Sequence, residues 1–233
     1  PEIVEYPETQ FYYIKNKNDF FLATKGGHNN ESHNHNDVGT FSLYYKQTPV
    51  FVDAGVGTYT RQTFGAERYS IWTMRSNYHN LPSVNGQEQK FGKEFRASTI
   101  DFNKKTKAIA IDISKAYSAE ANIQKWVRSY HLKDNELIVK DDFSLSKTED
   151  NNKIHFMLWG NIDISAKGKV MIEVNGVKME LLYNEKLFEP DMETIELPDT
   201  RLSNVWGKQI YRLTLTAKEK ALKSSYEDRI RTL

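Results

Sequence analysis

The sequence predicts an all-β protein, a large antiparallel β-sandwich of two sheets with few or no helices. Short runs rich in β-branched and aromatic residues follow one another along most of the chain, and turn-forming residues separate them. No long stretch shows a helical period. Because no fixed repeat and no linker-like segment divides the 233 residues, we expect a single domain over residues 1–233.

A hairpin early in the chain is expected to set the position of one carboxylate. The runs TFSLYYK (40–46) and PVFVD (49–53) flank a turn at Gln47-Thr48. Residues equally far from a hairpin turn face each other in an antiparallel pair. Asp53 is therefore expected beside residues 40–42, at the start of the first strand.

The other strands follow from the same signals. Asn175-Gly176 is the strongest hairpin signal in the chain, because both residue types accept the left-handed backbone of a two-residue turn. Helical signals are limited to a turn or two at 66–73 and 114–121, and the tail from Lys218 is expected to be helical or frayed. Residues 123–132 and 136–142 are predicted to form two strands joined as a hairpin. Further strands are predicted for residues 106–113, 153–159 and 209–217.

Composition argues against several function classes. The chain has 32 basic and 31 acidic residues, a formal net charge of +1, so it lacks the strongly basic balance expected for binding duplex nucleic acid. No apolar run approaches the roughly 20 residues of a membrane helix, and no signal-peptide pattern opens the chain. The absence of Cys excludes thiolate metal sites, which leaves His, carboxylate and backbone oxygen as ligands. The first residue is Pro, as expected for a processed or excised piece of a longer protein.

Candidate metal ligands gather around the segment ESHNHNDVGTF, residues 31–41. The predicted hairpin returns Asp53 to within side-chain reach of His35, and His79 follows in a later polar loop. Two imidazoles and one carboxylate form a valid ligand set for a divalent metal, with Zn²⁺ the leading candidate. In an extended segment His33 would share a face with His35, so it is either another ligand or an imidazole left free for chemistry.

Structural roles compete with these functional ones. A histidine near a strand end is commonly a partly exposed polar residue, and His28 is expected to be solvated in its loop. Asp37 is expected to cap the loop through backbone N–H groups rather than to bind metal. Most aromatic side chains are expected in the core, although some could form a sugar-stacking platform. His131 and His155 alternate with strand residues and are expected to be structural, whereas turn formation and substrate contact are both open for Asn34, Asn36, Asn77 and Asn80.

Three motifs in order resemble the heparinase II/III-like family of polysaccharide lyases. They are H-N-H-N-D-x-G-x-F at 33–41, V-D-A-G at 52–55 and R-S-x-x-H-N-x-P-x-V-N-G-x-x-Q at 75–89. The resemblance implies a C-terminal β-sandwich that follows an N-terminal helical (α/α) toroid in the parent enzyme. It also implies β-elimination on uronic-acid-containing polysaccharides such as heparan sulfate or alginate. No segment of this chain could supply the toroid, which in such enzymes carries a catalytic Tyr and the groups that neutralise the uronate.

The resemblance also assigns roles to individual residues. His35, Asp53 and His79 match the metal ligands, usually assigned to one structural zinc, and His33 matches a histidine that faces the cleft. Tyr69 is a candidate catalytic or substrate-contacting residue on the sandwich side. Arg75 and Asn80 are candidates for ordering the loop or for binding an anionic sugar. The family implies a periplasmic or extracellular location for the parent.

Three functions remain open from the sequence. The first is the metal-binding C-terminal domain of a polysaccharide lyase, which contributes one wall of a composite cleft and has little or no turnover alone. The second is a non-catalytic carbohydrate-binding or structural β-sandwich. The third is a free-standing hydrolase that uses a zinc-bound water.

Overall fold

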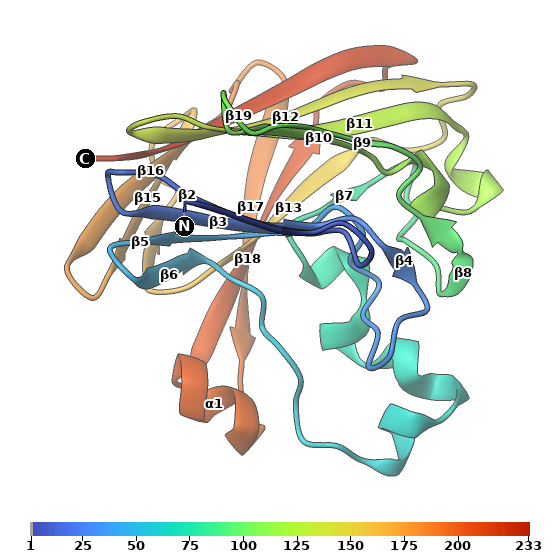
Figure 1. Ribbon diagram of the computed structural model, residues 1–233, viewed down its shortest axis with the longest axis horizontal. Coiled ribbons are helices and arrows are strands. Elements are labelled where there is room, and N and C mark those ends of the chain that lie inside the picture. Colours follow the sequence, from blue (N-terminus) through green and yellow to red (C-terminus); the bar gives the residue numbers. More distant parts are fainter. Residues whose placement is uncertain (1) are drawn as a thin grey trace.

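The computed structural model describes residues 2–233 and confirms the predicted sandwich of two large antiparallel sheets (Figure 1). The spatial order of the first sheet is β1 (Ile3–Tyr6), β2 (Phe11–Lys15), β3 (Phe20–Lys25), β5 (Phe41–Tyr45), β6 (Thr48–Phe51), β13 (Lys153–Leu158), β18 (Gln209–Ala217) and β17 (Phe188–Glu196). The short strand β7 (Pro82–Ser83) also pairs with β13.

The second sheet lies against the inner face of the first (Figure 1). A short pair, β4 (His28–Asn29) with β8 (Gly92–Arg96), stands beside the sandwich. The spatial order of the second sheet is β14 (Asn161–Asp163), β15 (Lys169–Val174), β16 (Val177–Leu182), β19 (Lys223–Thr232), β12 (Glu136–Leu145), β11 (Ile123–Leu132), β10 (Ala108–Asp112) and β9 (Ile100–Asn103).

The core forms because alternate residues of each strand point inward. Phe41, Phe51 and Phe156 from the first sheet pack among one another and meet Tyr130 of the second sheet. All four are buried in one continuous apolar cluster. Complete burial of a large apolar side chain stabilises the folded state by about 1.5–3 kcal/mol, so this layer holds the two sheets face to face.

The hairpin that positions Asp53 is present, but its turn lies one residue earlier than expected. Lys46 and Gln47 take the left-handed conformation, with φ of 48° and 64°, and Tyr45 pairs with Thr48. A bulge between Leu43 and Tyr44 then shifts the register of β5 against β6. The bulge compensates for the displaced turn, so Asp53 still returns to the start of β5.

The Asn175-Gly176 hairpin and the hairpin between β11 and β12 are confirmed. The expectation for the tail is wrong, because residues from Lys223 onward form β19 between β12 and β16. Tyr226, Asp228 and Ile230 point inward at alternate positions. An acidic residue at an inward position interrupts the apolar alternation and hides the strand from a pattern analysis.

The helical segments are short. The expected turns at 66–73 and 114–121 are 3₁₀ rather than α-helical, and α1 (Thr200–Trp206) was not anticipated. Among residues 2–233, no helix is both long enough and apolar enough to cross a bilayer. The 3₁₀ turns are η1 (Arg61–Phe64), η2 (Ala66–Ser70), η3 (Trp72–Met74), η4 (Ser76–Tyr78), η5 (Ser114–Ala116) and η6 (Ala119–Ala121).

The outer face of the first sheet is covered over only part of its width. A second apolar cluster joins Met157 and Ile210 of the sheet to Leu202 of α1 and to Trp72 and Tyr78 of the 3₁₀ turns. In Figure 1 these turns and α1 lie on the side of the first sheet that faces away from the second sheet. The turns η3 and η4 therefore pack on the first sheet next to β6, near the candidate ligands.

Candidate active site and metal centre

The loop that carries His33 and His35 is held in a folded rather than an extended shape. His33 has φ of 58°, a left-handed conformation that is uncommon outside glycine. The N–H of Asn36 donates to the carbonyl of Met74 (2.9 Å), and Arg68 donates from Nε and Nη2 to the carbonyl of Asn34 (3.1 and 2.8 Å). The 3₁₀ turns thus tie down the loop from the opposite side.

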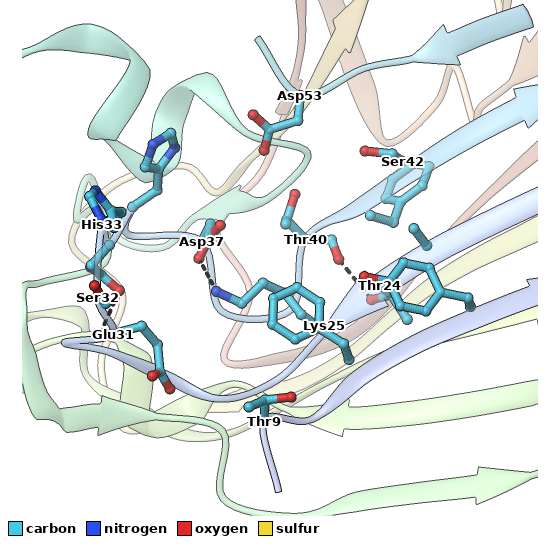
Figure 2. A pocket seen from close by; sticks show the side chains of 16 residues that line it. Thr9, Thr24, Lys25, Glu31, Ser32, His33, Asp37, Thr40, Ser42 and Asp53 are labelled. Carbon is cyan, nitrogen blue, oxygen red and sulfur yellow. Dashed lines mark hydrogen bonds and ion pairs between the residues drawn. The ribbon is translucent and has the colours of Figure 1, made fainter. Parts of the chain in front are cut away.

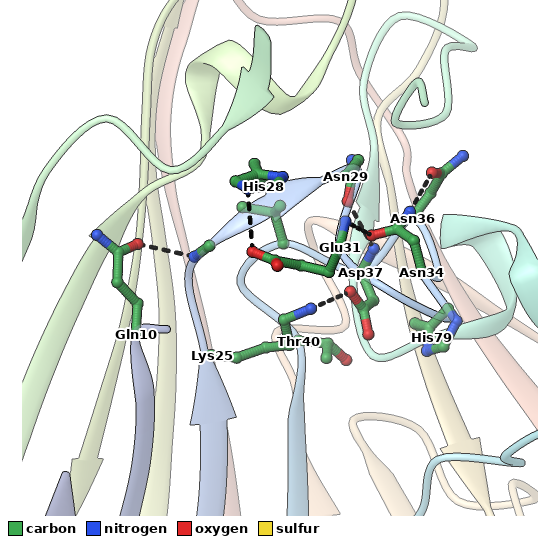
Figure 3. A network of polar contacts seen from close by, with 12 residues as sticks. Gln10, Lys25, His28, Asn29, Glu31, Asn34, Asn36, Asp37, Thr40 and His79 are labelled. Carbon is green, nitrogen blue, oxygen red and sulfur yellow. Dashed lines mark hydrogen bonds and ion pairs between the residues drawn. The ribbon is translucent and has the colours of Figure 1, made fainter. Parts of the chain in front are cut away.

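Asparagine and glutamine side chains complete this support (Figure 3). Asn29 accepts from the N–H of Asp37 (3.2 Å) and donates to Gln89 (3.1 Å). Gln89 in turn accepts from the N–H of Val38 (3.0 Å) and donates to its carbonyl (2.7 Å). Asn36, like Asn29, is buried, so these amides shape the loop.

Asp53 lies just past the end of β6, where an Asx turn orients its carboxylate. The N–H of Gly55 donates to Asp53 Oδ1 (2.8 Å), and Gly55 itself has φ of +80°. Glycine takes this backbone conformation without the steric penalty that a Cβ brings. With Oδ1 held in this way, Oδ2 faces His79 Nδ1 at 3.0 Å.

His79 is buried and has both ring nitrogens engaged. Nε2 lies 3.0 Å from the carbonyl of Thr73 in η3, and Nδ1 lies 3.0 Å from Asp53. A carbonyl can only accept a hydrogen bond, so Nε2 carries the proton in the neutral ring. Nδ1 is then the nitrogen with a free lone pair, and it points at the carboxylate cluster.

Four side chains gather here: His35, Asp37, Asp53 and His79, each with a donor atom within 4.8 Å of the others. The rings of His35 and His79 lie 5.3 Å apart between centroids. Asp37 belongs to this group, and no backbone N–H donates to its carboxylate among the described residues. Lys25 Nζ binds Asp37 Oδ1 instead (2.6 Å), so the expected capping role of Asp37 is wrong.

The cluster has shifted proton affinities. Desolvation alone would raise the pKa of Asp53, but the charge and hydrogen bond of His79 outweigh it and hold the pKa well below its usual range. Desolvation would lower the pKa of His79, and the adjacent Asp53 carboxylate reverses that effect and raises it. The pKa of His35 is lowered, first by desolvation and then by His79. Without a metal, His79 and Asp53 thus form a charge-assisted pair.

The donor set suits a divalent cation. Two imidazoles and carboxylate oxygens within a few ångströms of one another are ligands that Zn²⁺ accepts. The Thr73 carbonyl accepts from His79 Nε2 and so fixes the ring with Nδ1 toward the cluster. Lys25 already offsets the charge of Asp37, which leaves Asp53 as the carboxylate whose charge only His79 balances. His35, Asp53 and His79 can therefore hold a metal ion, and Asp37 stands next to them.

His33 lies outside this cluster. The left-handed backbone at His33 means that the segment is not extended here, so the geometry on which the expected shared face depends is absent. His33 is exposed, and its Nδ1 lies 3.5 Å from the hydroxyl of Tyr59. Tyr59 also stacks on Phe64 (5.6 Å between centroids) and lies under the guanidinium of Arg201 (5.0 Å). No spacing rule pointed to Tyr59.

Two hollows meet at His33. The larger, of 480 Å³, contains His33, His35, Asp37 and Asp53 (Figure 2). The other, of 370 Å³, contains His33 and Tyr69. Tyr69 stacks on Phe91 at 4.7 Å and accepts a hydrogen bond from Asn34 (3.3 Å), so it shares a hollow with His33 but does not belong to the group of His35, Asp37, Asp53 and His79.

Asn80 and Arg75 are the two residues expected either to order the loop or to bind an anionic sugar, and the structure places them in different surroundings. Asn80 is 1% exposed; its amide donates to the carbonyls of Phe41 (2.7 Å) and Val52 (3.2 Å) and accepts from the N–H of Met157 (2.6 Å). The side-chain amide of Asn80 is thus buried and engaged within the described residues, and is not exposed to a sugar. Arg75 is partly exposed, pairs with Glu88, and lines a different hollow from His33.

The remaining histidines are structural. His155 is buried between the hydroxyls of Ser83 (2.7 Å) and Thr214 (3.0 Å), and burial lowers its pKa to about 3. His131 lies in β11, as expected. His28 is half-buried in β4 and pairs with Glu31 (3.2 Å), rather than being free in a solvated loop.

Comparison with known proteins identifies the family. The profile described as "Heparinase II/III-like, C-terminal" matches residues 1–212. The chain belongs to the heparinase II/III-like family. A search of the curated proteins finds no match.

Solved structures share the fold of this heparinase II/III-like chain. A mutant heparan sulfate lyase from Pedobacter heparinus is 18% identical with a TM-score of 0.75, and the match covers 98% of this chain and 36% of that one. A heparinase III is 16% identical with a TM-score of 0.74, covering 99% and 36%. Another heparinase III is 18% identical with a TM-score of 0.69, covering 97% and 35%. The chain thus spans about a third of the length of these proteins.

Proposed function

We propose that this chain is the metal-binding sandwich domain of a polysaccharide lyase that cleaves uronic-acid-containing polysaccharide by β-elimination. One observation carries the proposal. An exposed imidazole, His33, lies near the Tyr59 hydroxyl and lines the same hollow as His35 and Asp53, two members of the cluster that buried His79 completes. Family membership and the likeness to heparan sulfate lyases in fold support the same reading.

His33 and Tyr59 have the chemistry that elimination requires. The proton at C5 of the uronate must leave, the C4–O bond must break, and a C4=C5 double bond forms. His33 can take or hold a proton at Nδ1, and the Tyr59 hydroxyl can deliver one to the departing oxygen. The 3.5 Å separation is loose, as catalytic contacts commonly are without substrate. Tyr69 lines the adjoining hollow, where it can contact a sugar.

His35, Asp53 and His79 would hold a zinc ion in this proposal. The bound ion would supply positive charge that locks three chain segments together and would not need to touch the substrate. Residues of this chain also hold the site in place. Arg68 of η2 binds the carbonyl of Asn34 in the loop, and the carbonyl of Thr73 in η3 orients His79.

The other wall of the cleft would come from the parent protein. We propose that an N-terminal α/α toroid supplies the groups that neutralise the uronate carboxylate, and that the parent works in the periplasm or outside the cell. An acidic polysaccharide is the partner, and the fragment alone has little or no turnover.

Two measurements test the proposal. Metal analysis of chain purified without chelator should give nearly one Zn²⁺ per chain, lost in His35→Ala and Asp53→Ala but kept in His131→Ala. The parent, given heparosan or alginate, should produce the ultraviolet absorbance of unsaturated sugar ends, and His33→Ala should abolish it. Absence of metal in the wild type would overturn the ligand assignment, and product without unsaturated ends would indicate hydrolysis.

A further inference from the structure

The hollow at the cluster continues across the outer face of the first sheet. Figure 2 shows Asp53, Lys25 and Ser42 around the same space as His33. Besides the cluster, the hollow is lined by side chains of β2, β3 and β5: Phe11, Tyr13, Ala23, Thr24, Lys25, Phe41 and Ser42. Whatever enters beside Asp53 therefore also meets this part of the sheet.

Small side chains form the floor of this extension. Strand register places Tyr13 opposite Ala23, and Ala23 opposite Ser42. Ala23 and Ser42 are half-buried and alternate with the inward-facing Leu22 and Leu43, so both point outward. Because a large ring is followed by two small side chains in one row, the sheet surface is recessed next to Tyr13.

Phe11 and Tyr13 line the recess, and they belong to a row of aromatic rings on the same face of the sheet. The ring of Tyr13 lies 6.1 Å from those of Tyr6 and Phe21 and 6.4 Å from that of Phe11, and Phe21 lies 5.8 Å from Tyr44. Tyr6 is 54% exposed, and the other four are half-buried. These rings cross four strands on a face that neither α1 nor the 3₁₀ turns cover.

Polar groups interrupt the rings. Lys25 Nζ lies 5.5 Å from the Phe11 ring while it binds Asp37, and Lys15 is exposed opposite Phe21. The hydroxyl of Ser42 faces the recess, and Thr9 lies at its rim. The centre of a protein–protein interface is typically depleted in such charged residues. Rings, a cation and hydroxyls together suit a ligand that is apolar on its faces and polar around its edge.

We propose that this recess, bounded by Phe11, Tyr13 and Lys25 and floored by Ala23 and Ser42, binds a sugar unit of an acidic polysaccharide. A pyranose has C–H faces that pack on aromatic rings and hydroxyl or carboxylate groups that pair with Ser and Lys. This inference rests on the proposed function: the unit in the recess is a neighbour of the unit at His33. The sandwich would then contact at least two sugar units, so tight binding would require an oligosaccharide long enough to reach both positions.

Calorimetric titration of the 233-residue chain with uronate oligosaccharides tests this. The probes are a hexasaccharide and a disaccharide of alginate and of heparosan. Tyr13→Ala removes the ring, and Ala23→Phe fills the recess. Leu222→Ala is the control, since Leu222 is 55% exposed and precedes β19 in the second sheet. Both recess variants should weaken hexasaccharide binding about tenfold and change disaccharide binding less than twofold.

A variant that fails to fold leaves a second measurement on the wild type. Hydroxyl-radical footprinting with the hexasaccharide should protect Phe11 and Tyr13 and leave Leu222 unprotected. Wild-type affinity in both folded recess variants, or no protection of Tyr13, would overturn the recess, as would no hexasaccharide binding by the wild type. These outcomes are independent of the parent's elimination assay and of the metal content, which test the proposed function.

Discussion

Gly55 is the residue on which the orientation of the Asp53 carboxylate depends. Its backbone is left-handed, and nothing lies within 4 Å of the position a Cβ would take. Gly55→Ala should therefore cost about 1–2 kcal/mol of unfolding free energy through backbone strain alone. The strained turn also loosens the N–H bond to Asp53, so metal content after dialysis should fall. Chemical denaturation and metal analysis measure the two effects.

Gly176→Ala is the matched control. Gly176 has φ of +78° and equally open space, but it lies in the hairpin between β15 and β16. It should lose similar stability and keep all its metal. Equal metal loss in both variants would show that the Asx turn does not orient a ligand.

In the proposed metal site, His79 should make metal retention depend on pH. A ligand imidazole must be neutral, and Asp53 raises the pKa of His79 above its ordinary value of about 6.5. Protons therefore compete with the metal from neutral pH downward, whereas His35, with its lowered pKa, is already neutral. Zinc content after dialysis should be full at pH 8 and mostly lost by pH 5. Retention that stays constant over this range would indicate a site without His79.

The sequence was sufficient for three of the clustered residues and not for their surroundings. The hairpin brings back Asp53, and the motif resemblance added His79. Asp37 was assigned to a cap and Lys25 was not singled out, because their ion pair joins β3 to the loop by geometry that no spacing encodes. The orientation of His33 depends on a left-handed backbone angle that favours glycine. A histidine at this position does not indicate such an angle, so the orientation could not be predicted from the sequence.

At the scale of elements, η2 holds the loop of residues 31–37 through Arg68. Its guanidinium makes two bonds to the carbonyl of Asn34 and one to that of Thr63 (2.8 Å). Arg68→Met should free the loop of residues 31–37, so its amides exchange with solvent about tenfold faster while strands such as β12 are unchanged. Hydrogen exchange followed by mass spectrometry measures this. Arg61→Met, an exposed arginine of η1, is the control. Slow exchange in both variants would mean that Met74 alone holds the loop.

The strands that were predicted well share one property. The alternation of apolar and polar residues in their sequence matches the alternation of buried and exposed positions in the structure. β18 matches the expected 209–217. The Asn175-Gly176 turn needs no context, whereas Lys46-Gln47 carries no comparable turn signal, so the first hairpin was placed one residue late. β19 failed because Asp228 occupies a core position, which a single sequence cannot distinguish from an exposed one.

At the scale of the whole molecule, Asp228 links stability to pH. It is 1% exposed, neither of its carboxyl oxygens has a hydrogen-bond partner among residues 2–233, and burial together with nearby Asp141 raises its pKa to about 8. Below the ordinary aspartate pKa of 3.8, the folded and unfolded chains both hold this proton. As the pH rises to 8 only the folded chain holds it, so the free energy of unfolding declines by up to about 1.4 kcal/mol per pH unit.

Asp228→Asn should remove this decline. The variant is expected to match the wild type near pH 4 and to exceed its unfolding free energy by a few kcal/mol at pH 8, measured by urea denaturation. Asp141→Asn is the contrasting variant, because it weakens the ion pair with buried Arg128 and should destabilise the chain at neutral pH. A wild-type profile in Asp228→Asn would mean that the carboxyl is ionised in the fold.

The place of β19 has a consequence for how the protein is made. This strand enters the middle of the second sheet, between β12 and β16, and pairs with both. Until it leaves the ribosome, the two halves of that sheet have exposed, unpaired edges, which are prone to pair with other chains. We therefore expect the nascent chain to remain unfinished and dependent on chaperones until residue 232 emerges. The sandwich would then close late and all at once, rather than growing strand by strand from its N-terminus.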